Sequence, residues 1–205
     1  MFAARNIFQT TSAGGAARAA QYYGSTSTST HPNTSANIMN LWYRRSVIAY
    51  TYTAAELSGY GLITGSVISK LRWYVTDPAP SAYQPMPNYA ITMEHIGSAT
   101  SSSNPTQISG ANLTTVKNQH GLTQTTVGYH EVTLDNTFTW NGTDGIGFVH
   151  AWGQVPTGYV RDGISYVQPG NVYFTRTDGA GTYPVSQSVT STYSNQRPVV
   201  ELFST

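Results

Sequence analysis

The sequence predicts an all-β protein, an antiparallel jelly-roll-like β-sandwich of about eight strands with an extended N-terminal arm. Three observations support this fold class. From residue 41 onward, short segments alternate between apolar and polar residues, short polar loops separate these segments, and no segment has the pattern of a long helix. Parallel strands need long crossover connections, so the short loops favour antiparallel pairing.

Composition divides the chain of 205 residues into two parts. We expect residues 1–37, which are rich in Ala, Gly, Ser and Thr, to form a docking arm and linker, and residues 38–205 to form the sandwich domain. Within the arm, Ala and Arg favour about two helical turns over residues 15–23, and residues 24–33 are expected to be extended. Ordering this arm costs backbone entropy that its own side chains cannot offset, so we expect a neighbouring chain to hold it.

The sandwich domain is expected to begin with a strand at 41–52, which is rich in aromatic and β-branched residues. Thr53 and Glu56 then have the spacing of a capping box, which predicts one short helical turn ending at Gly59. The next strand, 66–76, alternates regularly, as a half-buried strand does. Its predicted inward face holds Val67, Leu71, Trp73 and Val75, and its outward face holds Lys70, Arg72 and Thr76.

The remaining strands follow the same patterns along the rest of the chain. They are expected at 89–96, 113–117, 129–134, 145–152, 171–177 and 198–203. The segment 145–152 is apolar on both faces, which indicates a central strand.

Composition also limits the classes of function. Only 9% of the residues are charged, against about 25% in an average globular protein, so the surface is expected to be rich in Ser, Thr, Asn, Gln and Tyr, as suits extracellular or virion assemblies. The chain has no cysteine, which excludes disulfides and thiol nucleophiles. A net charge of +1 gives no signal for nucleic-acid binding. No apolar run approaches membrane-spanning length, and the start lacks the apolar region of a signal peptide, so we expect no membrane partner and, for an extracellular protein, another route of export.

Four short motifs recur in a known order along residues 50–203: YTAAEL, NYAITM, TLDNTFTWNGT and SNQRP. In this order they resemble a β-sandwich module of secreted bacterial surface proteins, which is also similar to domains of phage structural proteins. The resemblance implies a jelly-roll-like sandwich used for attachment or display, and it brings no catalytic residues. Because the module stands almost alone behind an arm, the resemblance favours a structural protein.

The sequence contains five histidines but no recognisable catalytic or metal-binding motif. The histidines are His31, His95, His120, His130 and His150. No pair of them has metal-site spacing, and Glu94–His95 and His130–Glu131 are strand neighbours whose side chains point to opposite faces. There is no G-x-S-x-G motif, and no two carboxylates are marked as a glycosidase pair. We therefore expect no enzyme activity, no cofactor and no metal.

A calcium site near Asp135 and Asp144 is a lesser alternative to a simple hairpin. These two acids flank the turn dipeptide Asn141-Gly142, but the regular ligand ladder of an EF-hand is missing. Hairpin chemistry is therefore the preferred interpretation.

Tyrosine is unusually frequent, with 15 residues. Several are expected in loops, namely Tyr60, Tyr83, Tyr159, Tyr183 and Tyr193. Exposed tyrosines are favoured in protein interfaces because one end of the side chain is apolar and the other is polar, and they also stack on sugars. We rank a protein interface first, an ordinary sandwich tyrosine second and a glycan contact third.

These observations lead to the expectation of a virion structural protein on the capsid surface, most like a bacteriophage capsid decoration (cement) protein. It would bridge neighbouring subunits of the major capsid protein and stabilise the shell, as a homo-oligomer for which a trimer is the first candidate by analogy. The expected partner-binding residues of the arm are Phe2, Arg5, Ile7, Phe8, Arg18, Tyr22 and Tyr23.

The first alternative is a receptor-binding or carbohydrate-binding module of a tail fibre or cell surface, with an exposed tyrosine-lined groove. The second is a secreted hydrolase, with polar residues converging in one pocket.

Overall fold

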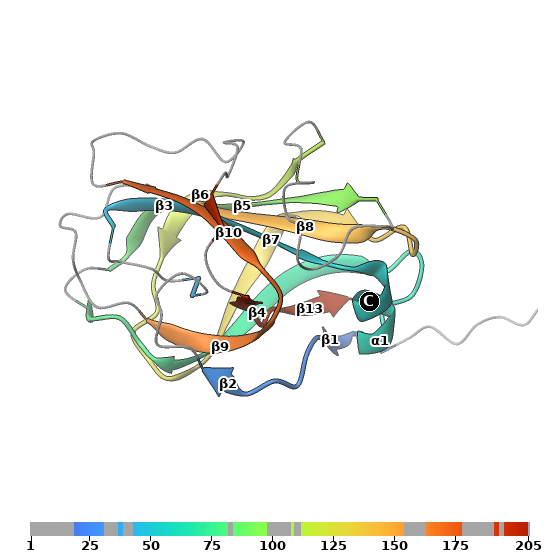
Figure 1. Cartoon of the computed structure of the whole chain (residues 1–205), viewed down its shortest axis with the longest axis horizontal. Coiled ribbons are helices and arrows are strands. Elements are labelled where there is room, and N and C mark those ends of the chain that lie inside the picture. Colours follow the sequence, from blue (N-terminus) through green and yellow to red (C-terminus); the bar gives the residue numbers. More distant parts are fainter. Residues whose placement is uncertain are drawn as a thin grey trace, which may run out of the picture.

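A computed structural model describes residues 19–30, 37–38, 43–81, 84–97, 108, 112–153, 163–177, 191–192 and 195–204. These residues form thirteen strands and one short helix, and the strands make two antiparallel sheets that pack as a sandwich (Figure 1). The predicted all-β sandwich is confirmed. The strand number is higher than expected because several short segments pair with the edges or ends of longer strands.

The first sheet contains seven strands. They are β1 (Gln21–Tyr23), β2 (Ser29–Thr30), β4 (Val67–Asp77), β7 (Gly128–Thr139), β9 (Ile164–Pro169), β12 (Gln196–Pro198) and β13 (Glu201–Ser204). Their order is β1-β13-β4-β9-β12, with β7 along the other side of β4 and β2 beside β9. The long strand β4 thus lies at the centre of this sheet. Leu71, Trp73 and Val75 are buried as predicted, and the residues between them are only partly buried. The prediction is wrong for Val67, because a register shift between Ile68 and Lys70 breaks the alternation and places Ile68 in the core instead.

The second sheet contains six strands. They are β3 (Arg45–Tyr52), β5 (Met86–Ile96), β6 (Thr114–Leu122), β8 (Gly145–Trp152), β10 (Val172–Thr177) and β11 (Ser191–Thr192). Their order is β11-β10-β3-β8-β5-β6. Every residue of β8 is buried, so the prediction of a central strand at 145–152 is confirmed.

The chain changes sheet at nearly every step. From β3 to β10, each strand lies in the sheet opposite to its predecessor, except that β6 follows β5 in the same sheet. This crossing pattern is the jelly-roll-like feature of the fold. Between the two layers lies a continuous apolar core that includes Trp73, Trp140 and Trp152.

The helix α1 (Ala54–Tyr60) forms as the capping box predicts. The Thr53 hydroxyl accepts a hydrogen bond from the Glu56 N–H, and the Glu56 carboxylate accepts one from the Thr53 N–H at 2.8 Å. The helix runs past the predicted end at Gly59 and closes at Gly61, which adopts a left-handed φ of 101°. Leu57 anchors the helix in the core.

The end of the expected arm is part of the sandwich. The expected helix is wrong for residues 21–23, which form strand β1 and pair with β13. Strand alternation places Tyr23 in the core, where it is 4% exposed, and Tyr22 on the outer face, where its ring contacts Phe203. The chain's own body therefore pairs with this part of the arm. Residues 1–18 lie outside the described residues.

Candidate functional site: a tyrosine groove

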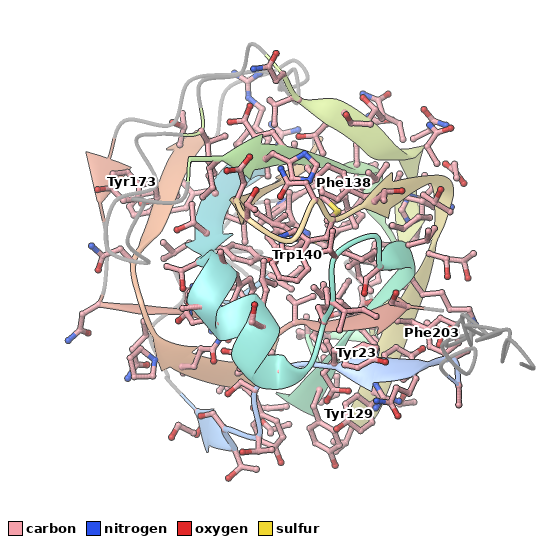
Figure 2. The ribbon with its side chains drawn as sticks, turned by 90° about the vertical axis from the view of Figure 1, so that its right-hand side faces the viewer. Tyr23, Tyr129, Phe138, Trp140, Tyr173 and Phe203 are labelled. Atoms are coloured by element: carbon pink, nitrogen blue, oxygen red, sulfur yellow. The ribbon has the colours of Figure 1, made fainter. Side chains whose placement is uncertain are left out.

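The outer face of the first sheet carries a hollow of about 380 Å³, which we call the tyrosine groove. Its lining is Tyr22, Gly24, Ser25, Thr26, Ser27, Thr28, Trp73, Tyr74, Tyr129, Tyr166, Val199 and Glu201. These residues come from β1 and the segment after it, from β4, β7 and β9, and from the chain around β13. Figure 2 shows Tyr129 at the outer edge of this layer.

Strand register brings the aromatic residues together. Tyr74 on β4 lies directly opposite Tyr129 on β7, and their rings meet edge to face with centroids 5.1 Å apart. On its other side Tyr74 stacks on Tyr166 of β9, with centroids 4.7 Å apart and planes inclined by 10°. Tyr129 is 52% exposed, so its ring presents apolar surface to solvent. The groove is thus walled by a contiguous aromatic cluster.

Arg72 contacts the rings of two residues that line the groove, Tyr22 and Tyr129. Its guanidinium carbon lies 3.5 Å from the centre of the Tyr22 ring and 4.1 Å from the centre of the Tyr129 ring. Its Nε donates to Glu201 Oε2 at 2.8 Å, and a second guanidinium nitrogen lies 2.6 Å from the same oxygen. Cation–π contacts of this kind favour one ring orientation, so the groove is organised before any ligand arrives.

Two carboxylates fix the phenol groups. Tyr129 donates its hydroxyl hydrogen to Glu201 Oε1 at 2.9 Å, and Tyr22 donates to Glu131, which also pairs with Lys70 at 2.9 Å. Hydrogen bonds from Tyr22 and Lys70 lower the pKa of the Glu131 carboxyl. Burial, followed by the hydrogen bond to Glu131, raises the pKa of the Tyr22 phenol to about 12. At neutral pH Tyr22 is therefore protonated and Glu131 is ionised.

The segment after β1 forms one wall of the groove. The Ser27 hydroxyl donates to the Val167 carbonyl at 2.8 Å, which fastens this wall to β9. Gly24 lets the segment pass close to β13, because a Cβ at this position would lie 2.8 Å from Glu201 Cγ and 3.0 Å from Glu201 Cα. Any larger residue would push the wall away from the groove.

Carboxylates are few in the lining of the groove. Among the described residues that line it, Glu201 is the only carboxylate, whereas most glycoside hydrolases use two. The nearby Glu131 has a lowered pKa, which is opposite to what a general acid requires. The groove offers aromatic surface, hydroxyl groups and one carboxylate.

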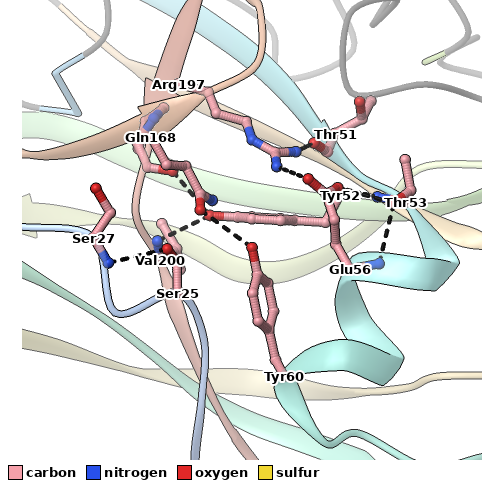
Figure 3. A network of polar contacts seen from close by, with 11 residues as sticks. Ser25, Ser27, Thr51, Tyr52, Thr53, Glu56, Tyr60, Gln168, Arg197 and Val200 are labelled. Atoms are coloured by element: carbon pink, nitrogen blue, oxygen red, sulfur yellow. Dashed lines mark hydrogen bonds and ion pairs between the residues drawn. The ribbon is translucent and has the colours of Figure 1, made fainter.

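A second polar cluster joins helix α1 to the C-terminal strands (Figure 3). Arg197, 1% exposed, pairs with Glu56, donates to the Thr51 carbonyl and lies 4.2 Å from the centre of the Tyr52 ring. Burial disfavours the charged form of Glu56, but its contacts with Arg197 and Thr53 outweigh this and lower its pKa. These groups are engaged with one another, so the cluster stabilises the fold.

A third cluster lies in the core. His150 Nε2 is 2.7 Å from the Tyr50 hydroxyl, and His150 Nδ1 is 2.5 Å from the Tyr89 hydroxyl. Burial lowers the pKa of the His150 imidazole to about 3, so the ring is neutral. No solvent reaches it in this structure, which excludes it from the binding surface.

Asn141-Gly142 forms a tight turn as expected, but the expected hairpin is wrong, because the flanking strands β7 and β8 lie in different sheets and do not pair. Asn141 Oδ1 accepts hydrogen bonds from the Thr143 and Asp144 N–H groups, and Gly142 has a φ of 83°. Asp135 is occupied by Lys117 at 2.7 Å. Within the described part of the chain, no three His, Asp or Glu side chains cluster closely enough to hold a metal ion, and no helix there could cross a membrane.

The sequence-predicted site residues are distributed differently from expectation. Tyr22 lines the tyrosine groove, Tyr23 lies in the core, and the half-buried Tyr60 donates to Gln168 Oε1 at 3.1 Å. The remaining candidates lie outside the described residues: Phe2, Arg5, Ile7, Phe8, Arg18, Tyr83, Tyr159, Tyr183 and Tyr193.

Sequence reasoning missed the other residues of the groove. Tyr74, Tyr129 and Tyr166 lie on strands, whereas the tyrosines predicted as contacts were those expected in loops. The alternation of 66–76 already placed Arg72 on the outward face, and the same alternation places Tyr74 beside it. The register that brings Tyr129 and Glu201 to these residues is a property of the folded sheet.

Comparison with known proteins adds little. No protein-family model and no curated protein matches the sequence. Among solved structures, the chain is similar to the cysteine protease and lectin-like domains of a surface layer associated protein of Clostridium difficile, with 6% sequence identity and a TM-score of 0.42. The similarity covers 78% of this chain and 32% of that chain, so the protein spans about a third of the other's length.

Proposed function

We propose that the protein is a non-catalytic carbohydrate-binding module that serves in attachment. The observation that carries this proposal is the contiguous cluster of Tyr74, Tyr129 and Tyr166 lining a hollow of about 380 Å³ beside Glu201. Sugar rings have apolar C–H faces and hydroxyl edges. Aromatic rings next to a fixed hydrogen-bond acceptor match both features.

The rigidity of the groove supports the same function. Tyr22 and Tyr129 are fixed through their rings by Arg72 and through their hydroxyls by carboxylates. Side chains that are already ordered lose little conformational entropy when a ligand binds, so more of the contact energy contributes to affinity.

Truncation of Tyr129 tests the proposal. Tyr129→Ala removes an exposed ring that no core contact requires, and it should lower affinity for any saccharide found on a glycan array by at least about tenfold, the scale of a lost central aromatic contact. Tyr129→Phe keeps the aromatic ring, so its affinity for the saccharide should fall less than that of Tyr129→Ala. Binding is measured by calorimetry.

The matched control is Ile63→Ala, which removes another large apolar side chain that is 56% exposed and lies outside the groove lining. This control should bind like the unmodified protein. If no saccharide on the array binds, or if Tyr129→Ala and Ile63→Ala bind equally well, the proposed function is wrong.

A role as a virion structural protein is the second proposal, and it concerns where the module acts. It is supported by the charged content of only 9%, which suits a large polar assembly, and by the place of β1 at the edge of the first sheet. In a capsid decoration protein, residues such as Phe2 and Phe8 would contact the major capsid protein, because Tyr23 is committed to its own core. Quantitative mass spectrometry of purified particles should then find a simple ratio to the shell protein, whereas a handful of copies would contradict decoration.

A further inference from the structure

We infer that the tyrosine groove selects an uncharged saccharide and rejects acidic glycans. This inference rests on the proposed function and names its ligand class. It follows from how the charges around the groove are arranged, and each step uses residues on the outward faces of β4, β7 and β13.

The basic side chains beside the groove are neutralised within the protein. Lys70 pairs with Glu131 at 2.9 Å, and Arg72 pairs with Glu201 at 2.6 Å. The guanidinium of Arg72 is also covered by the rings of Tyr22 and Tyr129. An acidic sugar needs a cation that can face it, and these two cations already face carboxylates.

The charged residue that does line the groove is acidic. Glu201 is part of the lining, whereas Lys70 and Arg72 are not. The Arg72–Glu201 pair has no net charge, but its carboxylate is the member that lines the groove, so a carboxylate or sulfate on a ligand would meet the like charge at closer range than the guanidinium. A neutral ligand has no such penalty.

Glu201 keeps acceptor capacity for hydroxyl groups. A carboxylate offers about four acceptor positions. In Glu201, Oε2 accepts from the Arg72 guanidinium and Oε1 accepts from the Tyr129 hydroxyl. Thr26 and Thr28 also line the groove, and a threonine hydroxyl can both donate and accept. Neutral sugars, whose hydroxyls also do both, fit this lining.

The test compares neutral and acidic oligosaccharides of equal length on the full chain. The probes are cello-, xylo-, manno- and galacto-oligosaccharides, together with oligogalacturonate and sialyl-lactose. We expect at least one neutral probe to bind about tenfold or more tightly than any acidic probe. Its affinity should change less than about twofold when NaCl is raised to about 1 M, because no ligand charge is screened.

A charge-removing variant sharpens the test. Glu201→Gln keeps the shape of the side chain but leaves the Arg72 charge uncompensated, so it should shift the ratio of neutral to acidic affinity toward acidic probes by about tenfold. Asp135→Asn is the matched control, because it removes one charge from the Lys117 ion pair, outside the groove lining, and should leave the ratio unchanged. Thermal unfolding checks that both variants fold.

The outcomes separate the inference from the proposed function. Preference for an acidic probe, with an affinity that falls as salt rises, would overturn the inference and leave carbohydrate binding intact. Equal binding of neutral and acidic probes would also overturn it. Binding of neither class would overturn the proposed function itself.

Discussion

His150 lies in the core with both ring nitrogens hydrogen-bonded to tyrosine hydroxyls, and this ties the stability of the protein to pH. In a neutral imidazole one nitrogen is a donor and the other an acceptor, so one of Tyr50 and Tyr89 accepts and the other donates. Protonation would turn both nitrogens into donors inside an apolar core. The folded state therefore binds this proton much more weakly than the unfolded chain does.

The first prediction concerns acid. Burial lowers the pKa of His150 to about 3, below its unfolded value of 6.5, so the stability it contributes is complete above pH 6.5 and is lost as pH falls toward 3. Between pH 6 and 5, where carboxylates are still mostly ionised, this group should lower the free energy of unfolding by about 1.2 kcal/mol. Urea unfolding at several pH values measures this. In His150→Gln, which cannot be protonated there, the slope should be absent; an unchanged slope would contradict the assignment.

The second prediction concerns Arg197. This buried side chain pairs with Glu56 and donates to the Thr51 carbonyl, so Arg197→Ala removes the cation beside the Glu56 carboxylate and a buried hydrogen-bond donor. Breaking a buried ion pair costs about 3–5 kcal/mol of unfolding free energy. The control is Arg72→Ala, which breaks a more exposed pair and should cost about 1 kcal/mol or less. Chemical denaturation measures the free energy of unfolding of both variants. Equal losses for the two would show that the Arg197 cluster does not stabilise the fold more than the Arg72 pair does.

The same cluster explains part of the sequence resemblance in physical terms. The YTAAEL motif supplies Tyr52 and Glu56, and the SNQRP motif supplies Arg197 and Pro198. In the fold these two motifs meet: the Tyr52 hydroxyl donates to the Pro198 carbonyl at 2.9 Å, and Glu56 pairs with Arg197. These motif residues therefore join helix α1 and strand β3 to the C-terminal strands. None of the four residues named here lines the groove.

At the scale of elements, strand β1 connects the arm to both the core and the groove. Its Tyr23 fills a core position, and the segment that follows it, 24–28, walls the groove. The sequence predicted a helix here because Ala and Arg precede the strand. Pairing with β13 overrides that local preference, because it satisfies backbone groups at the sheet edge and buries Tyr23.

The third prediction compares two truncations. Removal of residues 1–18 should leave the melting temperature and saccharide binding essentially unchanged, because β1 is kept. Removal of residues 1–28 deletes β1 and the groove wall, and it should lower the melting temperature by several degrees or more, since losing a buried Tyr side chain costs about 3–5 kcal/mol. Calorimetry measures both. Equal melting temperatures for the two truncated proteins would show that β1 does not stabilise the sandwich.

Other short elements show why sequence reasoning found fewer strands. β2 and β11 contain two residues each, and β12 contains three and ends in Pro198. Segments this short are too brief to show an alternation of apolar and polar residues. They are strands only because each pairs with a longer strand beside it. β9 was missed for another reason: Ser165 and Gln168 are buried polar residues, which hide the alternation of apolar and polar positions.

At the scale of the whole molecule, sequence patterns predicted the fold well and the site poorly. Seven of the eight expected strands each have one counterpart within a few residues, because alternation reports which face of a strand is buried. The eighth, expected at 198–203, is divided in the structure between β12 and β13, which pair with different neighbours. The groove could not be predicted in this way. It depends on register between β4, β7, β9 and β13, which are far apart in the chain, and on the path of residues 24–28 across the sheet.

The groove and the β6–β7 edge lie on different parts of the sandwich. The opposite flank is closed by contacts between β6 and β7, where Lys117 pairs with Asp135 and Asn136 donates to the Thr115 carbonyl at 2.9 Å. The groove lies instead where β1 and the segment after it cross the outer face of the first sheet. Ligand binding and docking of residues 19–30 should therefore stabilise each other, because both use the same wall.

The measurement that tests the central claim most directly is an NMR titration of protein carrying isotope-labelled tyrosine with the neutral oligosaccharide probes. The account predicts that the ring signals of Tyr74, Tyr129 and Tyr166 shift in a saturable manner, whereas those of the core residues Tyr50 and Tyr89 stay unchanged. Saturable shifts confined to tyrosines outside the groove, or no shift with any saccharide, would contradict it.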